Sequence, residues 1–252
     1  MPPWCWCSGK SAAGRAARVR RPALRQPRLT AELLALVDRV ETDPGPDAHR
    51  VPMTDDDYAA AAADIMTKCG GGPLRVFAYG SLLWKPGFDY SSRVPARLIG
   101  WHRAFCMTLN RFRGSPENPG LMLALDHGGS CVGEVFEVQP DAVAVELGKL
   151  LRREIPYRRL AGAYRWVEAR TGRGPVRALT FYAGMRNDHF YAVHPIAEQA
   201  RLIARAAGHG GSAAAYLFQT VNKLEELGIH DSYIWQLEEQ VAAEIRRMHP
   251  LA

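Results

Sequence analysis

The sequence has no long apolar run: none approaches the roughly 20 consecutive residues that a helix needs to cross a bilayer. It also lacks the hydrophobic segment of a secretory signal. Its 47% apolar and 23% charged residues are typical of a globular domain, and 252 residues suffice for one sizeable core. We therefore expect a cytoplasmic protein without a membrane partner.

Cysteines and histidines are too few and too scattered for a disulfide framework or a metal site. The five cysteines are odd in number and irregularly spaced, which favours reduced thiols. Cys106 and Cys131 lie in apolar, strand-like stretches, as buried structural thiols do. No two histidines stand at i, i+4 spacing, and the Cys5-Trp6-Cys7 pair lacks further ligands at zinc spacing. The sequence therefore predicts no metal site.

Acidic residues are missing from residues 1–28, which carry seven basic ones. This segment accounts for the formal charge of +6, because the rest of the chain holds 25 basic and 26 acidic residues. A nucleic-acid-binding protein carries its basic patch on the folded domain, so we expect no nucleic-acid partner. The segment is rich in Pro, Ala and Arg without an amphipathic period, which predicts a disordered basic tail. An Arg-rich, acid-poor start is also typical of a transit peptide.

Two predicted helices and a glycine-rich linker follow the tail. Residues 30–40 and residues 54–68 each begin with a threonine that can cap a helix. Residues 69–73 read Cys-Gly-Gly-Gly-Pro, which is typical of a linker. We therefore expect a helical extension and linker over residues 29–72 and the main domain over residues 73–248.

Strand signals dominate the first part of the main domain, and helical periodicity dominates its end. Strands are expected at residues 74–78, 96–109, 121–125, 131–138, 164–169 and 176–182. Helices are expected at residues 140–154, 196–207, 213–227 and 233–248. Strands first and helices gathered at the end indicate an α+β fold rather than alternating β-α-β units.

The first of these strands runs into Tyr79-Gly80-Ser81. Glycine has no Cβ, so the backbone N–H groups around it can approach a ligand closely and form a concavity that binds anions. An ordinary tight turn has the same pattern. A nucleophilic serine is disfavoured, because Tyr-Gly-Ser-Leu-Leu is not a Gly-x-Ser-x-Gly elbow.

A carboxylate lies at an unusual position in the helix expected at residues 140–154. Leu147, Leu150 and Leu151 share its apolar face, and Glu154 continues that face. Pro156 stops the helix shortly after. Burial and the negative end of the helix dipole both raise the pKa of such a carboxyl, as a general base near neutral pH requires. The alternative is that Glu154 pairs with a neighbouring arginine and titrates normally.

Five segments, in this order, resemble the ChaC family of γ-glutamylcyclotransferases. They are Val76-Phe-Ala-Tyr-Gly-Ser-Leu-Leu-Trp84, Gly100-Trp-His-Arg-Ala-Phe-Cys106, Pro119-Gly-Leu121, Leu151-Arg-Arg-Glu154 and Ala215-Tyr-Leu-Phe218. The resemblance covers residues 76–245. It departs from the family beside Glu154, where Arg152 and Arg153 precede and Ile155-Pro156 follows. The departure leaves the shape of the substrate pocket open.

The resemblance implies a γ-glutamylcyclotransferase-like mixed β-barrel with flanking helices. It implies cleavage of glutathione to 5-oxoproline and cysteinylglycine, without a metal or an organic cofactor. Separately, we expect a monomer or weak dimer. Glu154 matches the catalytic glutamate of the family. The substrate-binding residues of the family match Tyr79, Gly80, Ser81, Leu82 and Tyr216.

Three alternatives remain open. A cyclotransferase of this family could act on another γ-glutamyl amine or amino acid. A non-catalytic regulator of cation transport could sense γ-glutamyl compounds, although a sensor has no need of a buried base. An RNA-binding protein with a basic tail is disfavoured by the near-neutral main domain.

Overall fold

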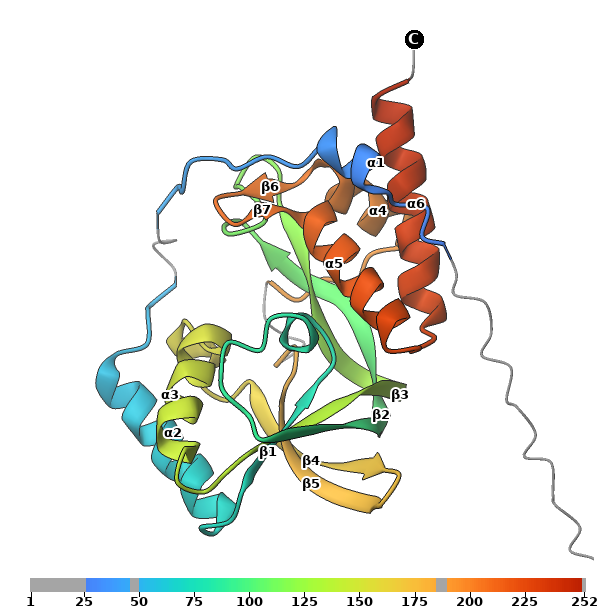
Figure 1. Ribbon diagram of the computed structural model, residues 1–252. Coiled ribbons are helices and arrows are strands. Elements are labelled where there is room, and N and C mark those ends of the chain that lie inside the picture. The colour runs from blue at the N-terminus through green and yellow to red at the C-terminus, as the bar shows by residue number, and fades with distance from the viewer. Residues whose placement is uncertain (1–25, 46–49, 185–189, 251–252) are drawn as a thin grey trace, which may run out of the picture.

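Five strands close into a barrel in the order β1-β3-β2-β4-β5 in the computed structural model, which describes residues 26–45, 50–184 and 190–250 (Figure 1). The strands are β1 (Leu74–Ala78), β2 (Ser92–Leu109), β3 (Gly120–Val138), β4 (Tyr164–Thr171) and β5 (Gly174–Phe181). β1 pairs in parallel with β5 where Val76 lies opposite Leu179, and the other pairings are antiparallel. The parallel pairing closes the barrel.

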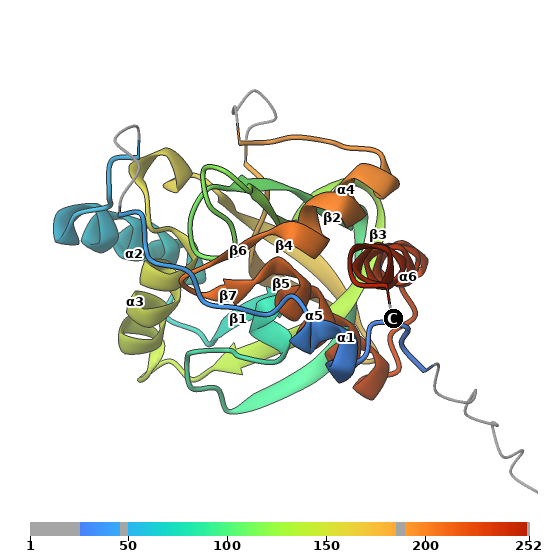
Figure 2. The same ribbon diagram turned by 90° about the horizontal axis from the view of Figure 1, so that it is seen from above.

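Helices flank the barrel in two groups. They are α1 (Ala31–Ala35), α2 (Asp55–Cys69), α3 (Val143–Glu154), α4 (Ile196–Arg205), α5 (Ala213–Glu226) and α6 (Ser232–Met248). α2 and α3 lie side by side on one flank, and α4, α5 and α6 gather on the other, around the far end of β2 and β3 (Figures 1 and 2). The short strands β6 (Ala207–Gly208) and β7 (Gly211–Ser212) join α4 to α5. The predicted α+β class, a mixed barrel with flanking helices, is confirmed.

The alternation of apolar residues along β1 divides the core into two parts. Leu74, Val76 and Ala78 pack into the larger cluster with α3, α5 and α6, and Phe77 packs into a second cluster. The second cluster draws residues from all five strands, so it fills the barrel. Because side chains alternate between the faces of a strand, β1 joins the barrel to its helices.

β3 is one continuous strand, so the prediction of separate strands at 121–125 and 131–138 was wrong. Glycines were read as a break, but Gly128 and Gly129 lie within the strand with positive φ angles of 110° and 66°. They face Gly100 on β2, where the register shifts between Ile99 and Trp101. A bulge of this kind bends a hairpin without ending it.

The predicted helix over residues 30–40 is shorter, since α1 ends at Ala35. Asp38 accepts hydrogen bonds from the backbone N–H and the hydroxyl of Ser212, at 3.1 and 2.7 Å. Val37 is buried and Arg39 donates to the Arg205 carbonyl. These long-range contacts prevail over the local helical preference.

Other sequence expectations concern the thiols, the tail and membrane spans. Cys106 and Cys131 are buried, as predicted, and burial raises the pKa of the Cys131 thiol to about 11. Most of the predicted tail, residues 1–25, lies outside the described residues. None of the helices in the described ranges is long and apolar enough to span a membrane.

Candidate active site

The chain makes a tight 3₁₀ turn immediately after β1. Tyr79 and Gly80 leave the strand, and η1 (Ser81–Leu83) follows. Leu82 and Leu83 are buried and anchor the turn in the core. The first bond of the turn runs from the Leu83 N–H to the Gly80 carbonyl, at 2.9 Å. The N–H groups that precede it in the turn have no carbonyl within the turn to bond, and the Ser81 N–H bonds the Tyr216 hydroxyl.

Glu154 is the last residue of α3, and its side chain is 21% exposed. Its Oε1 lies 3.0 Å from Nε of Arg153, so the predicted pairing with a neighbouring arginine does occur. Burial nevertheless raises the pKa of the Glu154 carboxyl, and the charge and hydrogen bond of Arg153 offset only part of that shift. The ion pair with Arg153 therefore does not return the pKa of the Glu154 carboxyl to its ordinary value, as the alternative required.

Arg153 also connects Glu154 to the turn after β1. Its Nη2 donates to the Ser81 hydroxyl at 2.9 Å, and its Nη1 donates to the carbonyls of Lys85 and Pro86. One guanidinium therefore holds the C-terminal end of α3 against η1 and the loop that follows it. Because the fork of an arginine is planar, these bonds also fix the direction in which it meets Glu154.

Tyr216 approaches the same place from α5. Its ring is buried and packs edge-on against Trp84 and Phe105, with centroids 6.0 and 6.1 Å away. Burial, together with the nearby charge of Glu154, raises the pKa of the Tyr216 hydroxyl to about 12, although hydrogen bonds with Ser81 lower it. The hydroxyl is therefore protonated at neutral pH and can donate a hydrogen bond.

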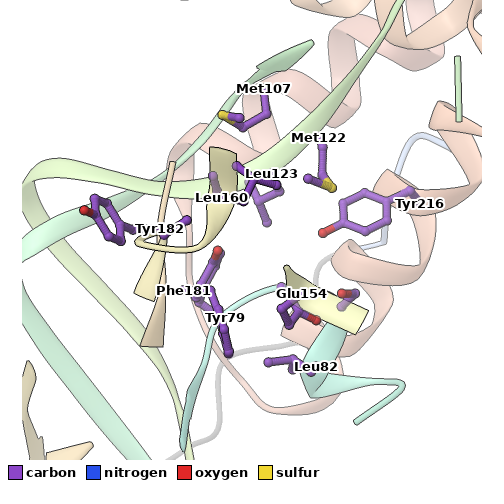
Figure 3. Close-up of a pocket in the computed structure, with 14 residues that line it drawn as sticks. Tyr79, Leu82, Met107, Met122, Leu123, Glu154, Leu160, Phe181, Tyr182 and Tyr216 are labelled. Carbon is purple, nitrogen blue, oxygen red and sulfur yellow. The ribbon is translucent and has the colours of Figure 1, made fainter. Parts of the chain in front are cut away.

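These groups line one cavity of about 80 Å³. All six residues predicted from the sequence border it: Tyr79, Gly80, Ser81, Leu82, Glu154 and Tyr216. Figure 3 shows the Tyr216 hydroxyl directed into the space that Glu154 and Leu82 also border, with Leu123 across it. The structure thus brings a carboxylate of raised pKa and the start of a backbone turn to the same cavity.

A larger groove of about 610 Å³ adjoins this cavity. The two share lining residues, among them Ser81, Glu154 and Tyr216, so the cavity and the groove lie side by side at these residues. A ligand can therefore place one end in the inner cavity and extend past Glu154 into the groove.

Sequence reasoning missed the wall that the barrel contributes. Met107 and Met122 are directly opposed across β2 and β3, and both line the cavity. A register shift between Phe105 and Met107 precedes this pair. The alternation of apolar and polar residues along a strand does not reveal such a shift in register. Sequence analysis therefore could not distinguish the two methionines from other strand residues.

Metal ligation has no support in the described ranges. They contain no group of three or more His, Cys, Asp or Glu side chains placed to hold a metal ion.

The main domain matches the model of a known protein family. The model of the ChaC-like protein family matches residues 74–244, which carry β1, η1, Glu154 and Tyr216. The chain belongs to the ChaC-like protein family. Two relatives of the ChaC-like chain are a glutathione-specific gamma-glutamylcyclotransferase of Escherichia coli (strain K12) and glutathione-specific gamma-glutamylcyclotransferase 1 of Homo sapiens.

The Escherichia coli relative is 34% identical over 176 residues, which are 69% of the ChaC-like chain and 74% of the relative. The Homo sapiens relative is 29% identical over 162 residues, which are 62% of the ChaC-like chain and 71% of the relative. A solved gamma-glutamyl cyclotransferase from yeast, specific to glutathione, superposes with a TM-score of 0.62 at 21% identity. The match covers 71% of the ChaC-like chain and 99% of the yeast protein, so the two share a fold.

Proposed function

We propose that this protein cleaves the γ-glutamyl amide of glutathione, releasing 5-oxoproline and cysteinylglycine. The observation that carries the proposal is the Glu154 carboxylate, whose pKa is raised, on the same cavity as the Gly80–Leu82 turn. Membership of the ChaC-like family and the substrate named for the Escherichia coli relative support it.

The γ-glutamyl group carries its own nucleophile. Its α-amine attacks the γ-carbonyl carbon, a five-membered ring closes, and the bond to the cysteine nitrogen breaks. The proton that leaves the attacking amine balances the one that the departing amine takes up. A well-oriented intramolecular attack has an effective molarity of about 10⁵–10⁸ M, worth about 7–11 kcal/mol. Positioning is therefore the main task of the protein.

Glu154 is the proposed general acid and base. The α-amine must lose a proton before it attacks, and a carboxylate of raised pKa accepts that proton near neutral pH. The same carboxyl then returns the proton to the cysteine nitrogen as the amide bond breaks. Glu154 lines both the cavity and the groove, so in this arrangement it lies where the glutamyl group and the departing amine meet.

The turn after β1 is the proposed anchor. Backbone N–H groups at Gly80, Ser81 and Leu82 bind the α-carboxylate of the glutamyl group or the oxyanion that develops on its γ-carbonyl. The protonated Tyr216 hydroxyl supplies a further donor. The glutamyl group thus occupies the inner cavity, and the cysteinylglycine part extends into the groove.

The deciding test is direct. Purified protein is incubated with glutathione and no added cofactor, and 5-oxoproline and cysteinylglycine are quantified together. Equimolar release of both supports the proposal. Faster turnover of γ-glutamyl-alanine than of glutathione supports a different γ-glutamyl substrate, and saturable binding of glutathione without any turnover supports a sensor.

Two further parts of the proposal concern location and domain limits. The reduced thiols of Cys69 and Cys131 suit a reducing compartment, so we place the protein in the cytoplasm. A fluorescent fusion of the full chain tests this. Residues 73–248 are proposed as the catalytic domain, in keeping with the range of the family match.

A further inference from the structure

The guanidinium of Arg103 is a buried cation that the proposed mechanism does not use. Arg103 lies on β2, and its side chain is 1% exposed. It bonds three other segments: Nε donates to the Tyr79 carbonyl at 2.7 Å, Nη2 to the Val132 carbonyl at 2.5 Å, and Nη1 to Oδ2 of Asp231 at 2.9 Å. A charge is tolerated in a protein interior only when such bonds compensate for its lost hydration. The position of each partner is therefore coupled to that of Arg103.

Arg103 joins β1 and β3 where their backbone pairing stops. The last pair is Ala78 and Glu134. Beyond it the chain leaves β1 at Tyr79, whereas β3 continues through Val132. Both of these carbonyls accept from one planar guanidinium, which holds them in fixed relative positions. The arginine thus fixes the start of the turn to β3 beyond the last strand pair.

Asp231 holds the guanidinium from the side of α6. One oxygen of its carboxylate, Oδ2, accepts from Arg103, and the other, Oδ1, accepts from the Ile234 N–H at 3.2 Å as the N-cap of the helix. The Asp231 side chain is 17% exposed, so this ion pair is largely shielded from water. Hydrogen bonds between charged groups are roughly twice as strong as those between neutral groups. A regular helix therefore supports the arginine that holds the turn.

The bond from Arg103 to the Tyr79 carbonyl also sets the direction of the Gly80 N–H. The two groups belong to one planar trans peptide, in which the carbonyl and the N–H point in opposite directions. Gly80 is buried and lines the inner cavity, and its N–H has no hydrogen-bond partner in the part of the chain that the structure describes. The Ser81 N–H, by contrast, bonds the Tyr216 hydroxyl. Because buried N–H groups are almost always bonded, the Gly80 N–H is suited to a ligand.

We propose that Arg103 is a positioning residue, which holds the Tyr79–Gly80 peptide so that the Gly80 N–H donates to the α-carboxylate of the glutamyl group. The inference rests on the proposed function and narrows it, because it assigns this N–H to the carboxylate and not to the oxyanion. Arg103 is not among the described lining residues of the inner cavity or the groove, so it acts through the peptide and does not touch the substrate.

The test uses glutathione and an analogue in which the α-carboxyl of the glutamyl residue is a carboxamide. Release of cysteinylglycine, which both substrates yield, measures turnover. In the test variant, Arg103→Met is combined with Asp231→Asn, so that neither charge is buried alone and asparagine still caps α6. We expect KM for glutathione to rise by about 10- to 100-fold, the range for a hydrogen bond to a charged group, with little change in kcat. KM for the carboxamide should rise much less, because a hydrogen bond to a neutral acceptor is weaker.

A loss of stability alone would not give this result. A smaller folded fraction lowers the apparent kcat but leaves KM unchanged, because KM reports only the molecules that are folded. Arg103→Lys keeps a cation opposite Asp231 but lacks the planar fork, so it should raise KM for glutathione by an intermediate factor. This variant carries the test if the double variant does not fold. The matched control is Arg75→Met combined with Glu137→Gln, which removes a 2.9 Å ion pair between β1 and β3 at the end of β1 away from the turn, and its KM stays at the wild-type value.

Unchanged KM for glutathione in a variant that is folded by circular dichroism overturns the inference, and so does an equal rise in KM for both substrates. A fall in kcat at unchanged KM also overturns it, because the peptide would then serve the oxyanion. Equal kcat/KM of the wild type for the two substrates removes the carboxylate anchor and the inference, but leaves the proposed cleavage of glutathione intact. No turnover of either substrate by the wild type overturns the proposed function itself.

Discussion

Arg153 Nε lies 3.0 Å from Glu154 Oε1 at the end of α3, and another nitrogen of the same guanidinium donates to Ser81. The cation favours the ionised form of the carboxyl and burial opposes it, with burial the larger effect. The result is a carboxyl whose pKa is raised, so its ionised form is a stronger base than an exposed glutamate. The first two predictions depend on this balance.

Glu154→Gln is expected to abolish release of 5-oxoproline from glutathione, because the amide cannot accept the proton of the α-amine. The loss in kcat should be at least about 10²–10⁴-fold, the usual contribution of general acid–base catalysis. Circular dichroism and glutathione affinity should change little. Glu168→Gln, an exposed carboxylate on β4, serves as the control and keeps full activity. Substantial turnover by the Glu154 variant would reject this residue as the base.

Arg153→Met should move the acid limb of the kcat/KM profile to higher pH. Glu154 works only when ionised, so activity falls as the pH drops through its raised pKa. Removing the cation destabilises the ionised form and raises that pKa further. Arg153→Lys retains a cation and should leave the limb near its wild-type position. An acid limb that does not move in the Met variant contradicts the assigned balance.

Gly80→Val is expected to raise KM for glutathione by at least about tenfold. A Cβ at Gly80 would lie 3.1 Å from the Tyr216 hydroxyl and 3.4 Å from Leu123 Cδ2, so the added side chain crowds the cavity. A cavity wall packed this closely tolerates added atoms poorly, because the neighbouring side chains must shift. Gly148→Ala on α3 is the matched control, since no atom lies within 4 Å of its added Cβ. An unchanged KM in the Gly80 variant would count against the anchor role.

Two truncations separate the tail from the extension. Removing residues 1–25 should leave kcat/KM and the melting temperature unchanged. Removing residues 1–52 should lower the melting temperature by several degrees, because Leu29 is 1% exposed and its N–H donates to Glu238 on α6. Calorimetry measures both melting temperatures, and equal values for the two truncations would contradict a stabilising role of the extension.

Much of the local structure was predictable from short patterns. The strand Leu74–Ala78 has the predicted bounds, and α2, α5 and α6 lie within one or two residues of theirs. Glu154 could be placed at the buried C-terminal end of a helix because Leu147, Leu150 and Leu151 have helical spacing. In each case the information is local, since a periodic pattern and its breakers lie within one segment.

Errors arose where distant contacts decide a local conformation. Gly128 and Gly129 bend β3 instead of ending it, because Gly100 on β2 completes the bulge opposite them. α1 ends early because Asp38 bonds to Ser212, which lies 174 residues further along the chain. No short window of sequence contains both partners.

By itself, the sequence determined the order of elements, the buried face of each and the chemical types available for a site. Only the tertiary structure decided that η1, the end of α3 and α5 meet at one cavity, and that the extension brings Arg50 to the groove beside it. The physical reason is that periodicity encodes which face of an element is apolar, but not which element covers it. Long-range contacts make that choice, such as the bond from Arg153 to Ser81 across 72 residues and the bridge between Pro52 and Tyr157.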